Sequence, residues 1–150
     1  MHIASLLRIG FLMGLSAVLS GCGGDSEFCS MLDEVKGGLL ANDTSLRGER
    51  AGPADTSSAA FKATKSLPGA SKCEIYDGGS GLVVYSCDYP GAAIEALRDR
   101  VDACGGEKLA WDEKGKQWFR GASDNLTLSV TTSEPVGSEP GISAIIFTRF

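Results

Sequence analysis

A β-hairpin with a cysteine on each strand constrains the fold of this chain more than any other segment. Residues 73–77 and 82–88 alternate apolar and polar side chains, and a Gly-Gly-Ser-Gly segment at 78–81 separates them. A tight three-residue loop within that segment sets a register in which Cys73 faces Cys87. That pair falls at a non-hydrogen-bonded position, where opposite side chains lie closest. We therefore expect an antiparallel hairpin closed by a Cys73–Cys87 disulfide.

The segments around this hairpin complete an α+β pattern. Apolar residues at helical spacing predict main helices over 27–40 and 92–103 and favour a short helix over 58–66. Further strands are expected at 108–112, 116–120, 126–131 and 142–149, with a Pro- and Gly-rich connection at 134–141 and a long loop at 41–57. This order indicates an α+β fold: an antiparallel sheet of about four to five strands, with two main helices packed on one side.

The N-terminal segment has the parts of an export signal. Arg8 precedes an apolar run at 9–19, which is too short to span a bilayer as an anchored helix. The run closes on Leu19-Ser20-Gly21-Cys22, and this tetrapeptide resembles the lipobox of bacterial lipoproteins, in which the cysteine receives lipid. An ordinary secretory signal followed by a coincidental cysteine is the alternative.

The lipoprotein resemblance implies how the chain is processed and held. It implies removal of residues 1–21 and lipidation of Cys22 with acyl chains such as palmitate, and several acyl chains anchor a protein firmly. We expect residues 22–26 to form a flexible tether and residues 27–150 a single periplasmic α+β domain. Gly23 is not the aspartate associated with inner-membrane retention in enteric bacteria, which favours the outer membrane, facing the periplasm.

Lipidation of Cys22 would leave four cysteines, and an even number in an exported chain indicates two disulfides. Three pairings are possible. With Cys73–Cys87 preferred from the hairpin, Cys29 and Cys104 remain. Cys29 lies in the first main helix, and Cys104 follows the second directly, in line with its apolar stripe. We therefore favour a fold stapled by Cys73–Cys87 and Cys29–Cys104. The chain has no Cys-x-x-Cys motif, which argues against redox exchange and against a zinc ribbon.

The composition argues against several classes of function. The only histidine, His2, lies in the segment that would be removed, so no Ser-His-Asp or Cys-His mechanism and no histidine-bearing zinc site can be built. The net charge of −5 becomes −6 without residues 1–21, and no basic run is present, which argues against nucleic-acid binding. We expect no catalytic residues, no metal and no cofactor.

Three aromatic residues are the candidate binding residues: Trp111, Trp118 and Phe119. Aromatic side chains dominate contacts with glycans and peptides. Because Trp118 and Phe119 are consecutive in a predicted strand, they point to opposite faces. One of them is therefore expected in the core and the other at the surface.

These observations lead to two main hypotheses. The first is a non-enzymatic, membrane-anchored periplasmic module that binds another envelope protein, as an accessory or inhibitory factor. The alternative is direct binding of peptidoglycan, glycan or a small envelope ligand through the Trp111–Phe119 region. A histidine-free hydrolase that uses two carboxylates is a more distant third, and it would need those groups to converge in a cleft.

Overall fold

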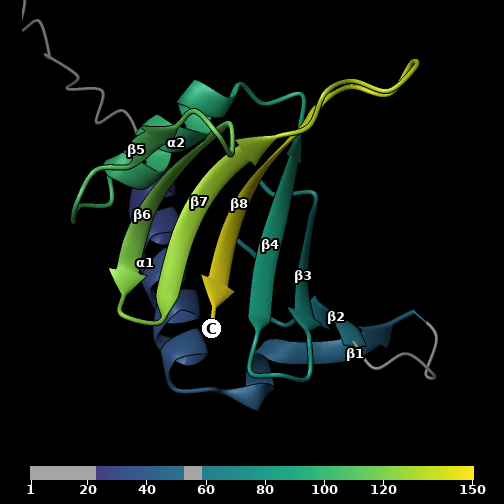
Figure 1. The fold of residues 1–150 in the computed structure, drawn as a ribbon. Coiled ribbons are helices and arrows are strands. Elements are labelled where there is room, and N and C mark those ends of the chain that lie inside the picture. Colours follow the sequence, from purple (N-terminus) through teal and green to yellow (C-terminus); the bar gives the residue numbers. More distant parts are fainter. Residues whose placement is uncertain (1–22, 53–58) are drawn as a thin grey trace, which may run out of the picture.

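The computed structural model describes residues 23–52 and 59–150, and within them the chain forms two α-helices and one sheet (Figure 1). In chain order the elements are α1 (Gly23–Leu40), the 3₁₀ turn η1 (Thr44–Leu46), β1 (Arg47–Ala51), β2 (Ala59–Ala63), β3 (Lys72–Asp77), β4 (Val83–Pro90), α2 (Ile94–Asp102), β5 (Ala110–Asp112), β6 (Gln117–Ser123), β7 (Leu126–Thr132) and β8 (Ile142–Arg149). The chain therefore passes twice through a helix followed by four strands.

All eight strands join one antiparallel sheet in the order β1-β2-β3-β4-β8-β7-β6-β5. The two four-stranded halves meet where β4 pairs with β8, from Val83 opposite Arg149 to Pro90 opposite Ile142. The predicted α+β class and antiparallel sheet are confirmed. The predicted number of strands, four to five, is wrong, because the described residues form eight.

Two of the extra strands lie in segments that were not expected to form strands. The predicted loop over 41–57 contains η1 and β1, and the predicted short helix over 58–66 contains β2 instead. In β2, Phe61 lies opposite Ile75 of β3, whose side chain is buried in the core. A helix of nine residues with one apolar anchor has little stability of its own, whereas pairing with β3 satisfies the backbone groups along that edge.

Both helices lie on the same face of the sheet (Figure 1). Their apolar stripes enter one core with the inward side chains of the central strands; the buried helix residues are Phe28, Leu32, Val35 and Leu39 from α1 and Leu97 and Val101 from α2. α1 starts four residues before its predicted beginning, so residues 23–26 of the expected tether are helical. Cys22 and the export signal lie outside the described residues.

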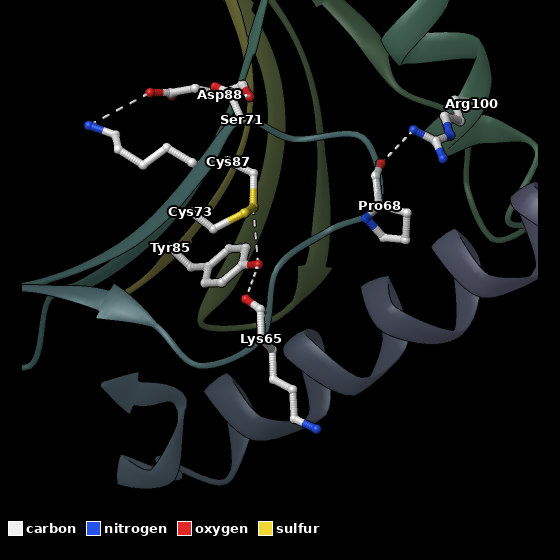
Figure 2. The surroundings of a disulfide bond; sticks show 9 residues. Lys65, Pro68, Ser71, Cys73, Tyr85, Cys87, Asp88 and Arg100 are labelled. Carbon is white, nitrogen blue, oxygen red and sulfur yellow. Dashed lines mark hydrogen bonds and ion pairs between the residues drawn. A yellow bond between two sulfur atoms is a disulfide. The ribbon is translucent and has the colours of Figure 1, made fainter. Parts of the chain in front are cut away.

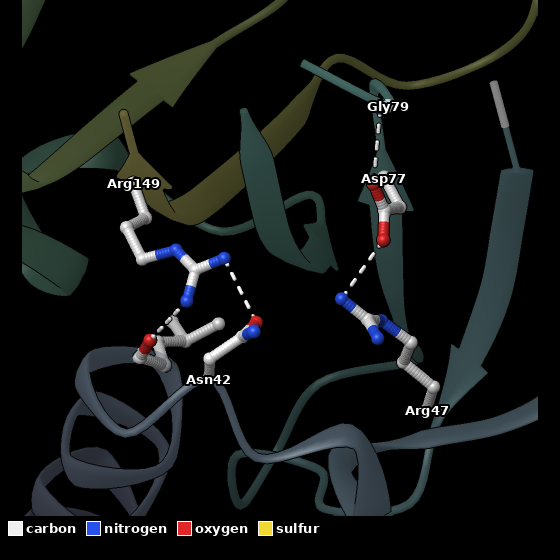
Figure 3. A network of polar contacts seen from close by, with 6 residues as sticks. Asn42, Arg47, Asp77, Gly79 and Arg149 are labelled. Atoms are coloured by element: carbon white, nitrogen blue, oxygen red, sulfur yellow. Dashed lines mark hydrogen bonds and ion pairs between the residues drawn. The ribbon is translucent and has the colours of Figure 1, made fainter. Parts of the chain in front are cut away.

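The end of α1 is fixed by the last strand. A side chain at position 38 would collide with η1, because a Cβ atom at Gly38 would lie 2.7 Å from Cδ1 of Leu46. Glycine at this position therefore allows η1 to pack against the helix. Asn42 follows the helix in the left-handed conformation, with φ of 54°. The guanidinium of Arg149 donates hydrogen bonds to the carbonyl oxygen of Leu39 and to Oδ1 of Asn42, both at 2.9 Å (Figure 3).

The structure contains both predicted disulfides. Cys29 of α1 is bonded to Cys104, just after α2, and Cys73 of β3 is bonded to Cys87 of β4. The expected register of the hairpin is also confirmed, because Cys73 lies directly opposite Cys87, with Cα atoms 4.1 Å apart. One bridge therefore joins the two helices, and the other joins neighbouring strands within the core.

Candidate functional site

The three predicted aromatic residues do not form one site. Trp111 of β5 lies opposite Trp118 of β6, and both point to the side of the sheet that carries the helices. Phe119 lies opposite Ser129 of β7 and points to the other side. The expected separation of Trp118 and Phe119 is confirmed: Trp118 is partly buried against the core, and Phe119 is 40% exposed.

The Trp111–Trp118 pair lies against α2. The two ring centroids are 5.3 Å apart with an interplanar angle of 57°, and the guanidinium carbon of Arg98 lies 4.5 Å from the centroid of the Trp118 ring. Arg98 also donates a hydrogen bond of 2.9 Å to Oδ1 of Asp99. Trp118 is thus held between its neighbours, while Trp111 remains 41% exposed at the edge of the sheet.

Phe119 belongs to a hollow on the side of the sheet that faces away from α1 and α2. The hollow has a volume of about 290 Å³ and is lined by Asp112, Gln117, Phe119, Thr127, Ser129, Thr148 and Phe150. Phe150 is 70% exposed, and its backbone N–H donates to the carbonyl oxygen of Asn125 at 3.0 Å. The hollow thus combines two accessible aromatic rings with hydroxyl, amide and carboxylate groups.

This hollow is part of a larger surface, which we call the open face. The open face consists of the side chains on five strands that point away from both helices: Glu74 and Tyr76 of β3, Val84 and Ser86 of β4, Ile146 and Thr148 of β8, Thr127 and Ser129 of β7, and Phe119 of β6. Within the described residues, no helix covers this surface. Aromatic, aliphatic and hydroxyl side chains therefore alternate across a broad sheet that is accessible from one side.

A second hollow lies on the helix side of the sheet. It has a volume of about 380 Å³ and is lined by residues of α1, of the segment after α2 and of β6, among them Asp33, Lys36 and Arg120. The guanidinium of Arg120 donates to the carbonyl oxygens of Gly105 and Glu107. Arg120 thus holds the backbone of the segment after α2, and that role accounts for its position.

Two buried tyrosines contribute to the core rather than to acid–base chemistry. The hydroxyl of Tyr85 donates to the carbonyl oxygen of Lys65 at 2.8 Å and lies 3.0 Å from Sγ of Cys87 (Figure 2). Burial raises the pKa of Tyr85 well above its ordinary value. Burial likewise raises the pKa of Tyr89 to about 12, against an opposing effect of the Arg100 charge. Both groups therefore stay neutral near pH 7.

Several other charged groups hold local structure through ion pairs or hydrogen bonds to the backbone. Arg47 forms an ion pair of 2.8 Å with Asp77, whose other oxygen accepts a hydrogen bond from the N–H of Gly79 (Figure 3). Oδ1 of Asp102 accepts a hydrogen bond of 3.0 Å from the N–H of Leu109. Among the described residues, no cluster of three or more histidine, cysteine or acidic side chains is arranged to hold a metal ion.

Comparison with protein families, curated proteins and solved structures finds no match to this chain. Within residues 23–52 and 59–150, no helix has the length and apolar character needed to cross a bilayer. A functional proposal for the folded part of the chain therefore depends on the geometry of the described residues. The strongest candidate is the open face with its hollow around Phe119, and the sequence did not indicate the part that Phe150, Thr127 and Thr148 take in it.

Proposed function

We propose that this protein is a lipid-anchored periplasmic module that binds another envelope protein and has no enzymatic activity of its own. The observation that carries the proposal is the open face. An antiparallel sheet often has one face packed on the core and one face in water. Here the outer face bears accessible Tyr76 and Phe119 among small hydroxyl side chains.

The composition of the open face favours a protein partner. Interfaces are enriched in tyrosine and phenylalanine at their centre and are surrounded by polar groups that remain hydrated. The cross-strand row that runs through Ser86, Ile146 and Ser129 joins Glu74 at one end to Phe119 at the other. A sheet face of this kind can meet a second folded domain without rearrangement of its own backbone.

The anchor is the second component of the proposal. The lipobox resemblance at residues 19–22 supports lipidation of Cys22 and a position at the outer membrane, facing the periplasm. Mass spectrometry of the protein purified from bacterial membranes should find acyl chains on an N-terminal Cys22. Replacement Cys22→Ala should release a folded protein into the periplasm. An unmodified Cys22 in the membrane fraction would contradict this component.

Site-specific photocrosslinking tests the binding surface. We expect benzoylphenylalanine at Ser129, in the middle of the open face, to form one discrete adduct with an envelope protein in intact cells. The matched control carries the same probe at Glu95, which is exposed on α2. Adducts of equal yield at Ser129 and Glu95, or none at Ser129, would overturn the assignment of the open face.

A glycan ligand is the second candidate, and the hollow around Phe119 favours it. Two accessible aromatic rings beside Asp112, Gln117 and Ser129 offer stacking surfaces and hydrogen-bonding groups of the kind that sugars use. Soluble peptidoglycan fragments should then shift the amide NMR signals of β6 and β7, and Phe119→Ala should abolish the shifts. Unchanged spectra at millimolar fragment would remove this candidate and leave the protein-binding proposal standing.

A further inference from the structure

The connection between β7 and β8 leaves the sheet as a projecting hairpin, drawn in yellow in Figure 1. We call residues 133–141 the arm. At its base, the N–H of Ser133 donates to the carbonyl oxygen of Ile142 at 2.8 Å, and the N–H of Ile142 donates to Oγ of Ser133 at 3.1 Å. At its tip, the N–H of Glu139 donates to the carbonyl oxygen of Val136 at 3.1 Å. The arm is therefore hydrogen-bonded at both ends.

The arm is ordered before any partner binds. Among its tip residues, Gly137 has a φ of 62° whereas Ser138 does not have a positive φ, which is the pattern of a type II′ hairpin turn. Pro135 and Pro140 each fix one φ angle on the two sides of that turn. The carbonyl oxygen of Gly141 accepts a hydrogen bond from Gly91, which ties the base to the end of β4. Such preorganisation lowers the entropic cost of binding.

The side chains of the arm have a distinct chemistry. Val136 at the tip is 77% exposed, more than any other large apolar residue in the described part of the chain. Glu134 and Glu139 flank it, and the arm contains no basic residue. Neither carboxylate forms an ion pair with the residues that the structure describes. The arm thus presents an aliphatic tip between two available negative charges.

We infer that the arm inserts into a cleft of the partner protein, with Val136 in a small apolar pocket and Glu134 and Glu139 against cationic side chains at the rim. This inference rests on the proposed protein-binding function and adds the chemistry of the partner. An accessible aliphatic side chain on a rigid projection fits a concave surface rather than a flat one. Paired negative charges select a cleft of opposite sign and speed its encounter.

Photocrosslinking with charge reversal tests the inference. The full-length protein, with benzoylphenylalanine at the exposed Ser138 beside the tip, is irradiated in its native host, and the crosslinked partner peptide is identified by mass spectrometry. We expect one discrete adduct, on a partner peptide that contains lysine or arginine. The double substitution Glu134→Lys/Glu139→Lys should lower its yield about tenfold. The matched control Glu113→Lys/Asp124→Lys, which reverses two exposed charges elsewhere, should leave the yield unchanged.

The outcomes separate the arm from the open face. Circular dichroism and the urea midpoint should be the same for both double variants, since residues 133–140, Glu113 and Asp124 are all exposed and lie outside the core. No adduct at Ser138, or a yield that both double variants lower equally, would overturn the inference. If the probe at Ser129 still forms its adduct in that case, the protein-binding proposal survives. Absence of adducts at both positions would overturn the two together.

Discussion

Removal of the Cys29–Cys104 disulfide should lower the free energy of unfolding by about 4 kcal/mol. The bridge spans 75 positions in the sequence. In the chain-entropy model, closing a loop of this size destabilises the unfolded chain by about 4.5 kcal/mol. The Cys73–Cys87 bridge spans 14 positions inside that loop and shortens it, which reduces the figure to about 4.3 kcal/mol. This is a large share of the 5–15 kcal/mol that is typical of a folded domain.

Equilibrium unfolding in urea measures this loss. We expect Cys29→Ala/Cys104→Ala to lower the midpoint by about 2 M, for a denaturant slope near 2 kcal/mol/M. The slope itself should rise, because the unfolded chain loses a cross-link and exposes more surface. Cys29→Ser/Cys104→Ser is the control for side-chain chemistry, since both cysteines are only partly buried. Agreement between the two variants within about 1 kcal/mol would assign the loss to the bridge.

A loss below about 1 kcal/mol in both variants would refute the entropic reasoning. It would mean that the reduced unfolded chain already holds the two helices near each other, so that the bridge removes little of its freedom. This comparison requires that the unfolding transitions followed by far-UV circular dichroism and by tryptophan fluorescence coincide. Trp118 lies between α2 and the sheet, so its fluorescence reports the docking of that helix.

Three further predictions concern buried and bridging side chains. Because burial raises the pKa of Tyr85 and Tyr89 above 10, and that of Tyr89 to about 12, stability that is intact below pH 10 should fall between pH 10 and 12. Urea midpoints across that range should fall less steeply for Tyr89→Phe, and an identical fall would contradict the assignment. Arg149→Met should lower the free energy of unfolding by about 1–3 kcal/mol and speed amide exchange at the end of α1. Unchanged exchange there would show that Arg149 does not stabilise the end of the helix. Arg98→Met should cost about 1 kcal/mol or less and alter Trp118 emission, and an unaltered spectrum would show that the guanidinium does not contact the ring in solution.

Local periodicity was sufficient to predict the centre of the fold. The register of β3 with β4 follows from strand alternation and one short loop, and that register places Cys73 opposite Cys87. The Cys29–Cys104 pairing then follows from the apolar stripes of two helices. These features depend on residues that are close in sequence, or on elimination among very few partners.

The strands at the sheet edge could not be predicted in the same way. β2 contains three alanines and a lysine, which favour a helix in isolation, and its strand conformation comes from pairing with β3. β1 consists largely of charged residues and glycine and has no apolar alternation. Its conformation depends on β2 being present beside it. Pairing partners distant in sequence thus overrode weak local preferences.

The candidate surfaces also combine features that follow from neighbouring residues with features that depend on strands distant in sequence. Alternation predicted that Trp118 and Phe119 would separate, because only two adjacent residues are involved. Thr148 and Phe150 reach the Phe119 hollow only because β7 pairs with both β6 and β8 and so brings the end of β8 near β6. The Pro- and Gly-rich segment at 134–141 was expected to connect two strands. Its projection as an ordered arm depends on hydrogen bonds at Ser133 and Glu139 that local composition does not specify.

The position of the Cys29–Cys104 bridge connects the architecture to the proposed anchor. α1 is continuous from Gly23, so a lipid on Cys22 would be attached about two helical turns before Cys29. Arg100 adds a second link between the helices, because its guanidinium lies 4.0 Å from the centroid of the Phe28 ring. The same guanidinium donates to the carbonyl oxygen of Pro68, in the connection between β2 and β3, at 2.8 Å (Figure 2). A force applied at Cys22 would therefore be transmitted by the bridge to α2 and to the strands β5–β8 that follow it. It would not act on α1 alone. In the proposed lipid-anchored state, the open face and the arm would then remain available to a partner while α1 stays packed on the core.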